Sequence, residues 1–300
     1  MKKNFISVII PAHNEEDVIS KAINSVLCST YKNYEIIVVN NGSTDNTKPI
    51  VNRFVKKYPR RIRLINFPSV SDKNIAKNRG PAFSRNQGAE VAKGDILAFL
   101  DADDWMCDDT LANIIKAFED YKEIDFLIGF RELFVPRNWK RIFLYYWLVK
   151  KKWIFDKEIE VMIDTPCCPY VMKTHNFFKV GKFDESLYYH EDNDFRLRLN
   201  KMKIPKLVIK KVHTYSDMGC EKRDFLRRCK NTAKGSLTNR VNLFKVFILF
   251  LFSFFTFPIF YLSAFFYVYF KSKDLLVSLT APILYFIRRF LDIYYLLNYL

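Results

Sequence analysis

Short apolar runs alternate with amphipathic stretches over the first 130 residues of this 300-residue chain. Five runs have the length and composition of buried strands, and they cover residues 7–11, 35–39, 63–67, 96–100 and 125–130. Helical patterns lie between them, at residues 15–29, 44–58, 81–92 and 109–121. Because this alternation is typical of a parallel sheet covered by crossover helices, we predict an α/β fold of the nucleotide-binding type.

Polar residues follow three of the predicted strands, at residues 11–15, 40–45 and 101–104. Ligands of open α/β sheets bind beyond the carboxyl ends of the strands. We therefore expect the three polar clusters to meet in one crevice.

The cluster at residues 101–104 contains an Asp-x-Asp motif formed by Asp101 and Asp103. Carboxylate oxygens are hard ligands that suit Mg²⁺ or Mn²⁺, and an ion held there can bind a diphosphate. Acidic triplets are also common helix caps, so the motif alone leaves both interpretations open.

A second acidic cluster, at residues 190–194, precedes the amphipathic run 195–199. Its carboxylates lie near a predicted helix N-terminus, where the helix dipole stabilises ionised acids. This position suits either a helix cap or a general base. The turn residues at 180–185 precede the cluster and can present Glu191 and Asp192 to a pocket.

The C-terminal part of the chain has a different composition. From Val246 to Phe270, 25 residues pass without a charge, more than the roughly 20 that a helix needs to cross a bilayer. We predict a membrane helix at 246–270, with a buried core helix as the alternative. Arg288 and Arg289 interrupt the apolar residues of segment 271–300, which we expect to lie at the interface or to span the bilayer marginally.

The net charge of +16 permits either nucleic acid or membrane lipids as a partner. Basic residues are frequent in the juxtamembrane segment 223–245, and the positive-inside rule places such a segment on the cytoplasmic side. Only six apolar or small residues precede Pro11, too few for a secretory signal. We therefore expect a domain of residues 1–222 on the cytoplasmic face of a membrane, with reduced thiols because the six cysteines form no Cys-x-x-Cys pair.

Residues 137–153 combine basic ends with an aromatic centre. Such a segment can rest on a membrane surface, with its aromatic rings at headgroup depth. A core helix and a nucleic-acid surface are the alternatives, and the predicted membrane helix argues against nucleic acid.

Five motifs occur in the order seen in family 2 glycosyltransferases, which the chain resembles over about residues 5–215. They are residues 7–16 (SVIIPAHNEE), 36–45 (IIVVNNGSTD), 84–88 (SRNQG), 100–104 (LDADD) and 181–184 (GKFD) followed by Glu191 and Asp192. The resemblance implies a GT-A fold, which is a mixed, mostly parallel sheet with helices on both faces. It also implies a nucleotide-sugar donor, a divalent cation (Mn²⁺ or Mg²⁺), and transfer with inversion.

The resemblance assigns donor-side roles to individual residues. Asn40 stands where the family usually has an Asp that contacts the base, and His13 replaces a commonly aromatic residue. Arg85 resembles the basic residue that helps to hold the diphosphate. The remaining matches to the nucleotide-sugar site are Pro11, Ala12, Asn14, Glu15, Asp101 and Ala102.

The resemblance also implies the metal ligands and the base. Asp103 matches the principal metal ligand, and Asp192 resembles the general base, with Glu191 beside it. His213 occupies a region where some members supply a further metal or phosphate contact, although a histidine without a functional role is equally consistent with the sequence.

We therefore predict a membrane-anchored, metal-dependent inverting glycosyltransferase that moves a sugar to the hydroxyl of a glycan or a lipid-linked acceptor. No nucleic-acid partner is expected. The nearest enzyme alternative is a polyprenyl-phosphate sugar transferase, which the form of the motif at residues 101–105 (DADDW) disfavours. A catalytically weak, membrane-bound nucleotide-sugar-binding protein is the alternative from another class, motivated by His13 and Asn40. No Trp follows Trp153, so the Gln-x-x-Arg-Trp element of processive synthases is missing and a single addition is favoured.

Overall fold

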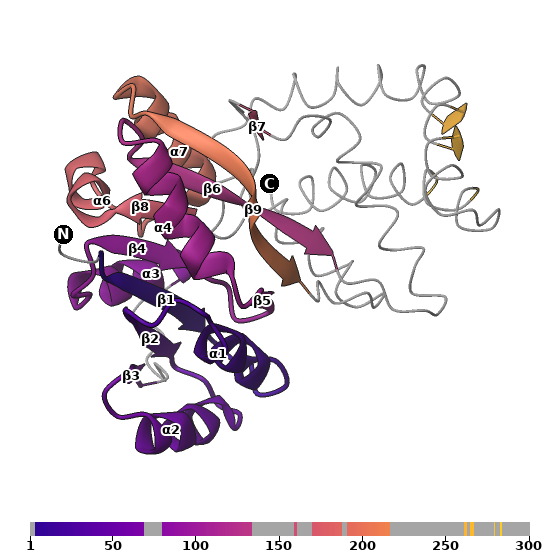
Figure 1. The fold of residues 1–300 in the computed structure, drawn as a ribbon. Coiled ribbons are helices and arrows are strands. Elements are labelled where there is room, and N and C mark those ends of the chain that lie inside the picture. Colours follow the sequence, from indigo (N-terminus) through magenta and orange to yellow (C-terminus); the bar gives the residue numbers. More distant parts are fainter. Residues whose placement is uncertain are drawn as a thin grey trace. The chain divides into compact units, whose positions relative to one another are not determined.

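The computed structural model describes residues 4–68, 80–133, 159–160, 170–187 and 191–216, together with six residues between 261 and 283 (Figure 1). The chain divides into two compact units. One contains residues 1–132 and 157–217, and the other contains residues 133–156 and 218–300. Nearly all described residues belong to the first unit, which carries every element discussed below.

A nine-stranded mixed sheet forms the centre of the described part. Its strands are β1 (Ile6–Ala12), β2 (Tyr34–Asn41), β3 (Ile62–Phe67), β4 (Ile96–Phe99), β5 (Asp104–Met106), β6 (Phe126–Leu133), β7 (Ile159–Glu160), β8 (Tyr170–Lys173) and β9 (Lys206–Ser216). The strand order is β3-β2-β1-β4-β8-β6-β9-β5, and β7 pairs with β9. Strands β3, β2, β1 and β4 are parallel, whereas β8 runs antiparallel to β4 and β6, and β5 and β7 run antiparallel to β9.

Six helices of the described part cover the two faces of this sheet (Figure 1). They are α1 (Ile19–Leu27), α2 (Thr47–Lys57), α3 (Pro81–Glu90), α4 (Thr110–Asp120), α6 (Thr174–Val180) and α7 (Glu191–Lys201). Helices α1, α2 and α4 share one hydrophobic core with alternate residues of β1 and β2, while α3, α6 and α7 share the other core with the intervening residues. Two-sided coverage explains why β1 and β2 are almost continuously apolar.

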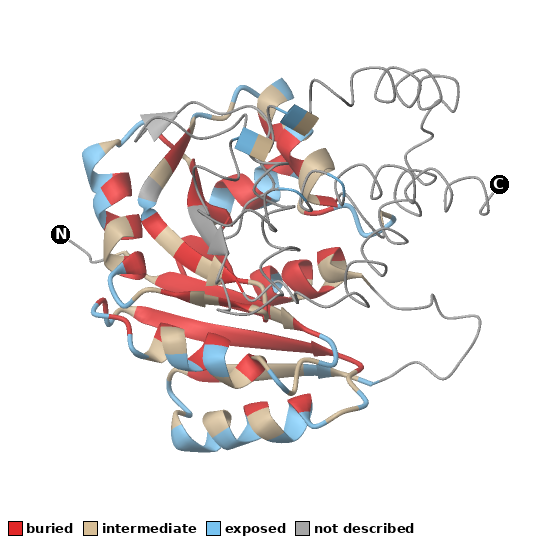
Figure 2. Cartoon of the chain, turned by 90° about the vertical axis from the view of Figure 1, so that its right-hand side faces the viewer, coloured by how far each residue is buried: buried red, intermediate tan, exposed pale blue. Residues whose placement is uncertain are grey.

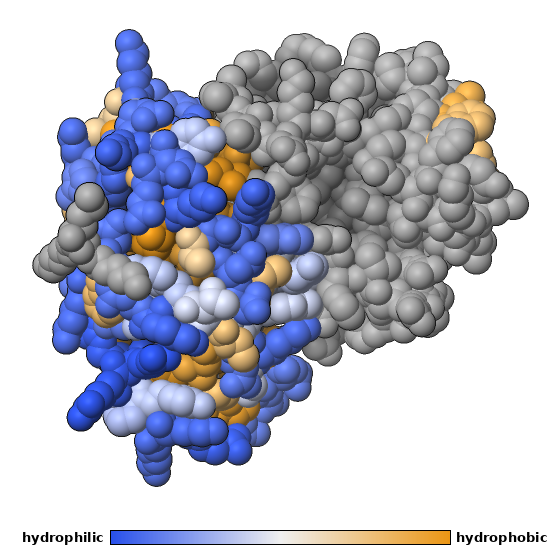
Figure 3. Space-filling view, viewed as in Figure 1, coloured by the Kyte–Doolittle hydropathy of each residue, from blue (hydrophilic) through white to orange (hydrophobic). Residues whose placement is uncertain are grey.

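Burial follows this arrangement. All eight residues of β2 are buried, and so are six of the seven residues of β1, which Figure 2 shows as red strands between helices. On the face shown in Figure 3, hydrophilic side chains predominate over the described elements and hydrophobic ones form small areas between them. This distribution is typical of the surface of a globular domain.

The predicted α/β class is confirmed, since the five predicted strands correspond to β1, β2, β3, β4 and β6 and the four predicted helices to α1–α4. Helix α1 begins at Ile19, four residues later than predicted. Asn14 adopts a left-handed backbone with φ of 58°, and the Glu15 carbonyl accepts hydrogen bonds from Val18 and Ile19. The chain therefore completes a turn before the helix starts, and Asn is one of the few residues that tolerate this conformation.

Among the described residues, no helix combines the length and the apolar composition needed to cross a membrane. The segments predicted at 137–153 and 223–245 lie outside the described residues, and so do nearly all of 246–270 and 271–300. The membrane helix predicted at 246–270 therefore finds no support in the described structure and stays a prediction.

Candidate active site

The loops that follow β1 and β2 are joined by hydrogen bonds at the carboxyl end of the parallel strands. The Asn14 side chain accepts from the Thr44 backbone N–H at 2.8 Å, and the Asn14 N–H donates to the Ser43 hydroxyl at 3.0 Å. The Glu15 N–H donates to the Thr47 hydroxyl at 2.8 Å. Since each bond links residues about 30 positions apart, the two loops form one wall, as the placement of their motifs predicted.

Pro11 and Ala12 are the last residues of β1 and lie in register with Val39 and Asn40 of β2. Asn40 is only 1 % exposed. Its amide donates to Asn66 at 2.8 Å, and its carbonyl oxygen accepts from the Ser43 hydroxyl. The neutral Asn40 side chain thus links the carboxyl end of β2 to that of β3.

Asp45 completes the wall. Burial raises the pKa of this carboxyl, but hydrogen bonds from the hydroxyl and backbone of Thr47 and from the backbone of Glu16 outweigh that effect and lower its pKa overall. The donor to the Asp45 Oδ2 atom is the Glu16 N–H at 3.1 Å. Ionised Asp45 therefore holds the start of α2 against the loop after β1.

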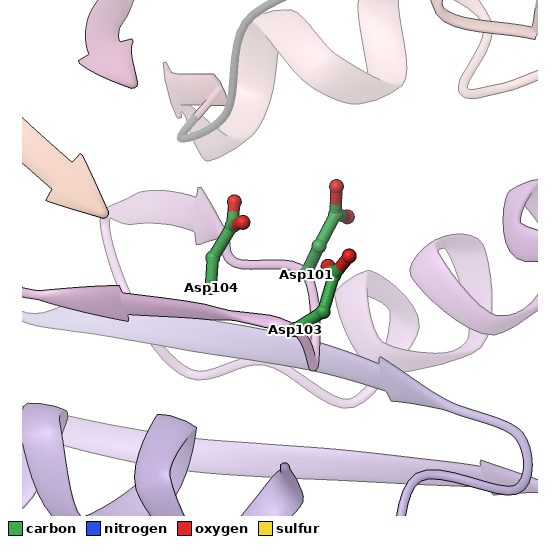
Figure 4. A group of neighbouring side chains, drawn as sticks. All are labelled: Asp101, Asp103 and Asp104. Carbon is green, nitrogen blue, oxygen red and sulfur yellow. The ribbon is translucent and has the colours of Figure 1, made fainter. Parts of the chain in front are cut away.

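Three carboxylates gather between β4 and β5. The possible ligand atoms of Asp101, Asp103 and Asp104 all lie within 4.8 Å of one another, and Figure 4 shows their carboxylates directed to the same side. Asp101 and Asp103 are partly exposed, whereas Ala102 between them and Asp104 are buried. Oxygen donors at this spacing fit a hard divalent cation such as Mg²⁺ or Mn²⁺.

Arg85 of α3 connects this acidic group with the second one. Its guanidinium donates from one nitrogen to Asp101 Oδ1 at 2.8 Å and from the other to Glu191 Oε1 at 2.7 Å. The side chains of Arg85 and Glu191 are each only 9 % exposed. The two acidic clusters, far apart in sequence, therefore meet at the same end of the sheet.

Glu191 and Asp192 occupy the first turn of α7 but have different surroundings. Burial raises the pKa of Glu191, and the neighbouring Arg85 guanidinium opposes that rise. Asp192 is less buried, and the Tyr170 hydroxyl donates to its Oδ2 at 3.5 Å. Glu191 is thus engaged inside the protein, whereas Asp192 is the more accessible carboxylate of the pair.

Tyr170 relates Asp192 to the acidic loop. The Cα of Tyr170 on β8 pairs with that of Phe99 on β4, two residues before Asp101. Asp192, which the Tyr170 hydroxyl reaches, is therefore tied to β8, the direct neighbour of the strand that precedes Asp101 and Asp103. Sequence reasoning missed Tyr170, because only the pairing of β8 with β4 brings it to the site.

His213 is not among the grouped acidic ligands of the described residues. It lies on β9 with its ring 4.6 Å from the ring of Tyr215, and its backbone carbonyl accepts from the Thr110 hydroxyl at 2.8 Å. The structure thus brings Asp101, Asp103, Arg85, Glu191 and Asp192 together but does not bring His213 to the carboxylate group.

Sequence reasoning also missed Asn86, the residue after Arg85. Its side chain donates to the Phe183 carbonyl at 2.9 Å and accepts from the Phe183 N–H at 3.0 Å. Its place in the segment 84–88 was the only available signal, because a buried asparagine on a helix leaves no periodic pattern.

The sequence profile described as Glycosyl transferase family 2 matches residues 7–176, more than half of the chain. The chain belongs to this family. A glycosyltransferase from Haemophilus influenzae is 38% identical over 111 residues, which are 37% of this chain and 41% of that protein. The chain therefore spans less than half the length of this curated relative.

Two solved structures resemble the fold of this family 2 member. The mannosyltransferase PcManGT from Pyrobaculum calidifontis, in complex with GDP-Man and Mn²⁺, has a TM-score of 0.65 at 16% identity, covering 99% of this chain and 87% of that one. TarS residues 1–349 from S. aureus, in complex with UDP, has a TM-score of 0.55 at 20% identity, covering 79% of this chain and 67% of that one. The mixed sheet is accordingly that of GT-A folds.

Proposed function

We propose that this chain is an inverting glycosyltransferase that uses a nucleotide-sugar donor. The observation that carries the proposal is the double contact of Arg85 with Asp101 and Glu191, which brings the carboxylates of the β4–β5 loop and those of α7 to one end of the sheet. The resemblance to structures with GDP-Man and UDP supports the class of donor.

Asp192 is the general base of this proposal. The acceptor hydroxyl transfers its proton to the Asp192 carboxylate while its oxygen bonds to the anomeric carbon. The bond from that carbon to the diphosphate oxygen breaks, and the nucleoside diphosphate leaves with the electron pair. A single displacement of this kind inverts the anomeric centre.

Asp101, Asp103 and Asp104 would hold Mn²⁺ or Mg²⁺. When bound, such a cation supplies positive charge that stabilises the diphosphate leaving group. Arg85 lies next to Asp101 and adds a fixed positive charge on the same side. The wall formed by the loops after β1 and β2 would bind the nucleoside, because hydrogen bonds join the two loops and they lie at the same edge of the sheet.

The test is a donor panel. The purified chain is incubated with UDP-, GDP- and dTDP-sugars with and without Mn²⁺, and thermal stability is read first because a bound ligand raises it. Glycan acceptors, lipid-linked sugars and polyprenyl phosphate are then added in separate reactions, so that each possible product can form. Release of nucleoside diphosphate from the donor that binds is then measured, and the anomeric configuration of the product is determined by NMR. A glycosidic product of inverted configuration is expected. A sugar phosphodiester would instead identify a polyprenyl-phosphate sugar transferase, and binding without turnover would identify a nucleotide-sugar-binding protein.

We propose in addition that the chain is anchored in a membrane, that its first unit faces the cytoplasm and that its acceptor is a glycan or a lipid-linked sugar. The uncharged run from Val246 to Phe270 and the basic segment 223–245 support this proposal. Alkaline carbonate extraction of cells that express the full chain tests the anchor. We expect the protein in the membrane pellet, and its release into the supernatant would contradict the anchor.

A further inference from the structure

Helix α3 contacts both the segment before α7 and the first residue of α7. Asn86, which is 1 % exposed, binds both the N–H and the carbonyl of Phe183 and also donates to Glu185 at 2.8 Å. The preceding residue, Arg85, binds Glu191 at the first position of α7. Two consecutive side chains of α3 thus fix residues before and at the start of the helix that carries Asp192.

Aromatic packing supports the same end of α7. The ring of Phe195, one turn after Glu191, lies 4.7 Å from the ring of Phe183. The Arg85 guanidinium lies over the Phe183 ring at 5.6 Å. Since Phe195 is 3 % exposed, this side of the helix is buried against α3 and the sheet.

We propose that Arg85 and Glu191 act as a positioning pair that fixes the distance between Asp192 and the carboxylates of the β4–β5 loop. This inference rests on the proposed function, in which Asp192 is the base. One arm of the guanidinium binds Asp101 and the other binds Glu191. Moving either carboxylate relative to the other requires breaking a charged hydrogen bond, which is about twice as strong as a neutral one.

The geometry distinguishes positioning from proton transfer. The Glu191 side chain is 9 % exposed and its Oε1 is bound to Arg85, so an acceptor hydroxyl cannot readily reach it. A guanidinium can also serve two separate carboxylates because its donors form a planar fork, whereas the ammonium of lysine is a point charge.

The experiment compares Glu191→Ala with Glu191→Gln in the full chain. Alanine removes the contact, and we expect turnover of the donor selected by the panel to fall about 10²-fold, the loss associated with a misplacement of about 1 Å. Glutamine keeps an oxygen that accepts from Arg85, and we expect it to restore turnover to within about tenfold of the wild type. Affinity for UDP and GDP, measured by titration with Mn²⁺, should change less than twofold in both variants.

Glu90→Ala is the matched control. Lys182 and Glu90 also connect the end of α3 with the segment before α7, at 2.7 Å, but their side chains are 38% and 45% exposed. Since exposed ion pairs contribute little, this variant should turn over like the wild type.

Arg85→Lys provides a second variant in case Glu191→Ala does not fold. It keeps the charge but loses the fork, so we expect a fall in turnover similar to that of Glu191→Ala. Turnover equal to that of the wild type in Glu191→Ala or in Arg85→Lys would overturn the inference. So would a Glu191→Gln variant as inactive as Asp192→Asn, because Glu191 would then be the proton acceptor.

Hydrogen exchange gives a readout that does not depend on activity. Amides in the second turn of α7, the first ones hydrogen-bonded within the helix, should exchange about tenfold faster in Glu191→Ala than in the wild type or in Glu90→Ala, because the helix start loses its partner. Unchanged exchange would overturn the positioning role. If the wild type transferred no sugar from any donor, the proposed function would fail, whereas the exchange measurement would still decide whether the pair holds α7.

Discussion

The parallel half of the sheet (β1–β4) and its antiparallel half (β5, β6, β8 and β9) are held at the site by different kinds of contact. In the parallel half, backbone groups of one loop bind the neutral or acidic side chains of the next, as between Asn14 and Thr44. In the antiparallel half, the start of helix α7 is held by the buried charged pair of Arg85 and Glu191, and the segment before it is held by Asn86. We therefore expect changes in the parallel half to affect mainly stability, and changes around α7 to affect mainly turnover.

Asp192→Asn should have the largest effect on turnover, because Asp192 lies on α7, where we expect changes to affect the chemistry. The amide cannot accept a proton, so we expect turnover to fall about 10³-fold, within the range attributed to general bases. Donor affinity should stay within twofold, because the wall of the parallel half is untouched. Turnover and affinity are measured on the same preparation, and wild-type turnover would remove the role of Asp192.

Asp103 lies between β4 and β5, where the two halves of the sheet meet. Asp103→Ala should therefore lower both donor affinity and turnover. Loss of one carboxylate from the group of three weakens any cation held there, so we expect Mn²⁺-dependent donor affinity and turnover to fall together, each about 10²-fold. Asp120→Ala, an exposed aspartate at the end of α4, is the control and should change neither. An Asp103→Ala variant that binds donor normally would show that the cation lies elsewhere.

Gly94→Ala tests the expectation that changes in the parallel half affect stability. A Cβ at this position would lie 2.5 Å from the backbone nitrogen of Ser7 and 2.8 Å from the Phe5 carbonyl. Since backbone atoms cannot yield as a side chain does, we expect a loss of about 1–3 kcal/mol in the free energy of unfolding. Thermal denaturation checks this, with the exposed neighbour Lys93→Ala as control. An unchanged midpoint for Gly94→Ala would show that the loop shifts without cost.

Asp45→Ala should have the smallest effect, and that effect should depend on pH. Its hydrogen bonds to Thr47 and Glu16 resemble a helix cap, worth about 1 kcal/mol. Because the folded protein lowers the pKa of Asp45, its stabilisation is present above the ordinary value of 3.8 and is lost as the pH falls through the lower folded value. Wild type and variant should therefore differ in midpoint at pH 7 and converge in strong acid. A difference in midpoint that does not change with pH would contradict the stabilising role of ionised Asp45.

The parallel half was largely predictable because its signals are local. Strands β1, β2 and β4 are short and mainly apolar runs followed by polar clusters, and the loop motifs fix which end of the sheet carries the site. The exception is the late start of α1, since the helical pattern at 15–18 does not reveal the left-handed Asn14. The backbone conformation of a single residue depends here on contacts with the neighbouring loop, which residue-by-residue patterns do not contain.

The antiparallel half was less predictable because its contacts are distant in sequence. Strand β5 has three residues, and its pairing with β9 joins Asp104 to Ser216. Arg85 was recognised as a site residue, but its bonds to residues 16 and 106 positions away could not be derived from spacing. The two acidic clusters were visible in the sequence. That the Arg85 guanidinium joins them could be seen only in the structure.

Only residues 100–103 separate β4, in the middle of the sheet, from β5, the last strand of the path β4-β8-β6-β9-β5. This short connection is anchored at both ends, by the pairing of β4 with β1 and β8 and by that of β5 with β9. A force that displaces the C-terminal end of β9 would be transmitted through Ser216 and Asp104 to Asp103 within two residues. The position of the carboxylate loop is therefore set by the pairing of β5 with β9 as well as by that of β4 with its neighbours.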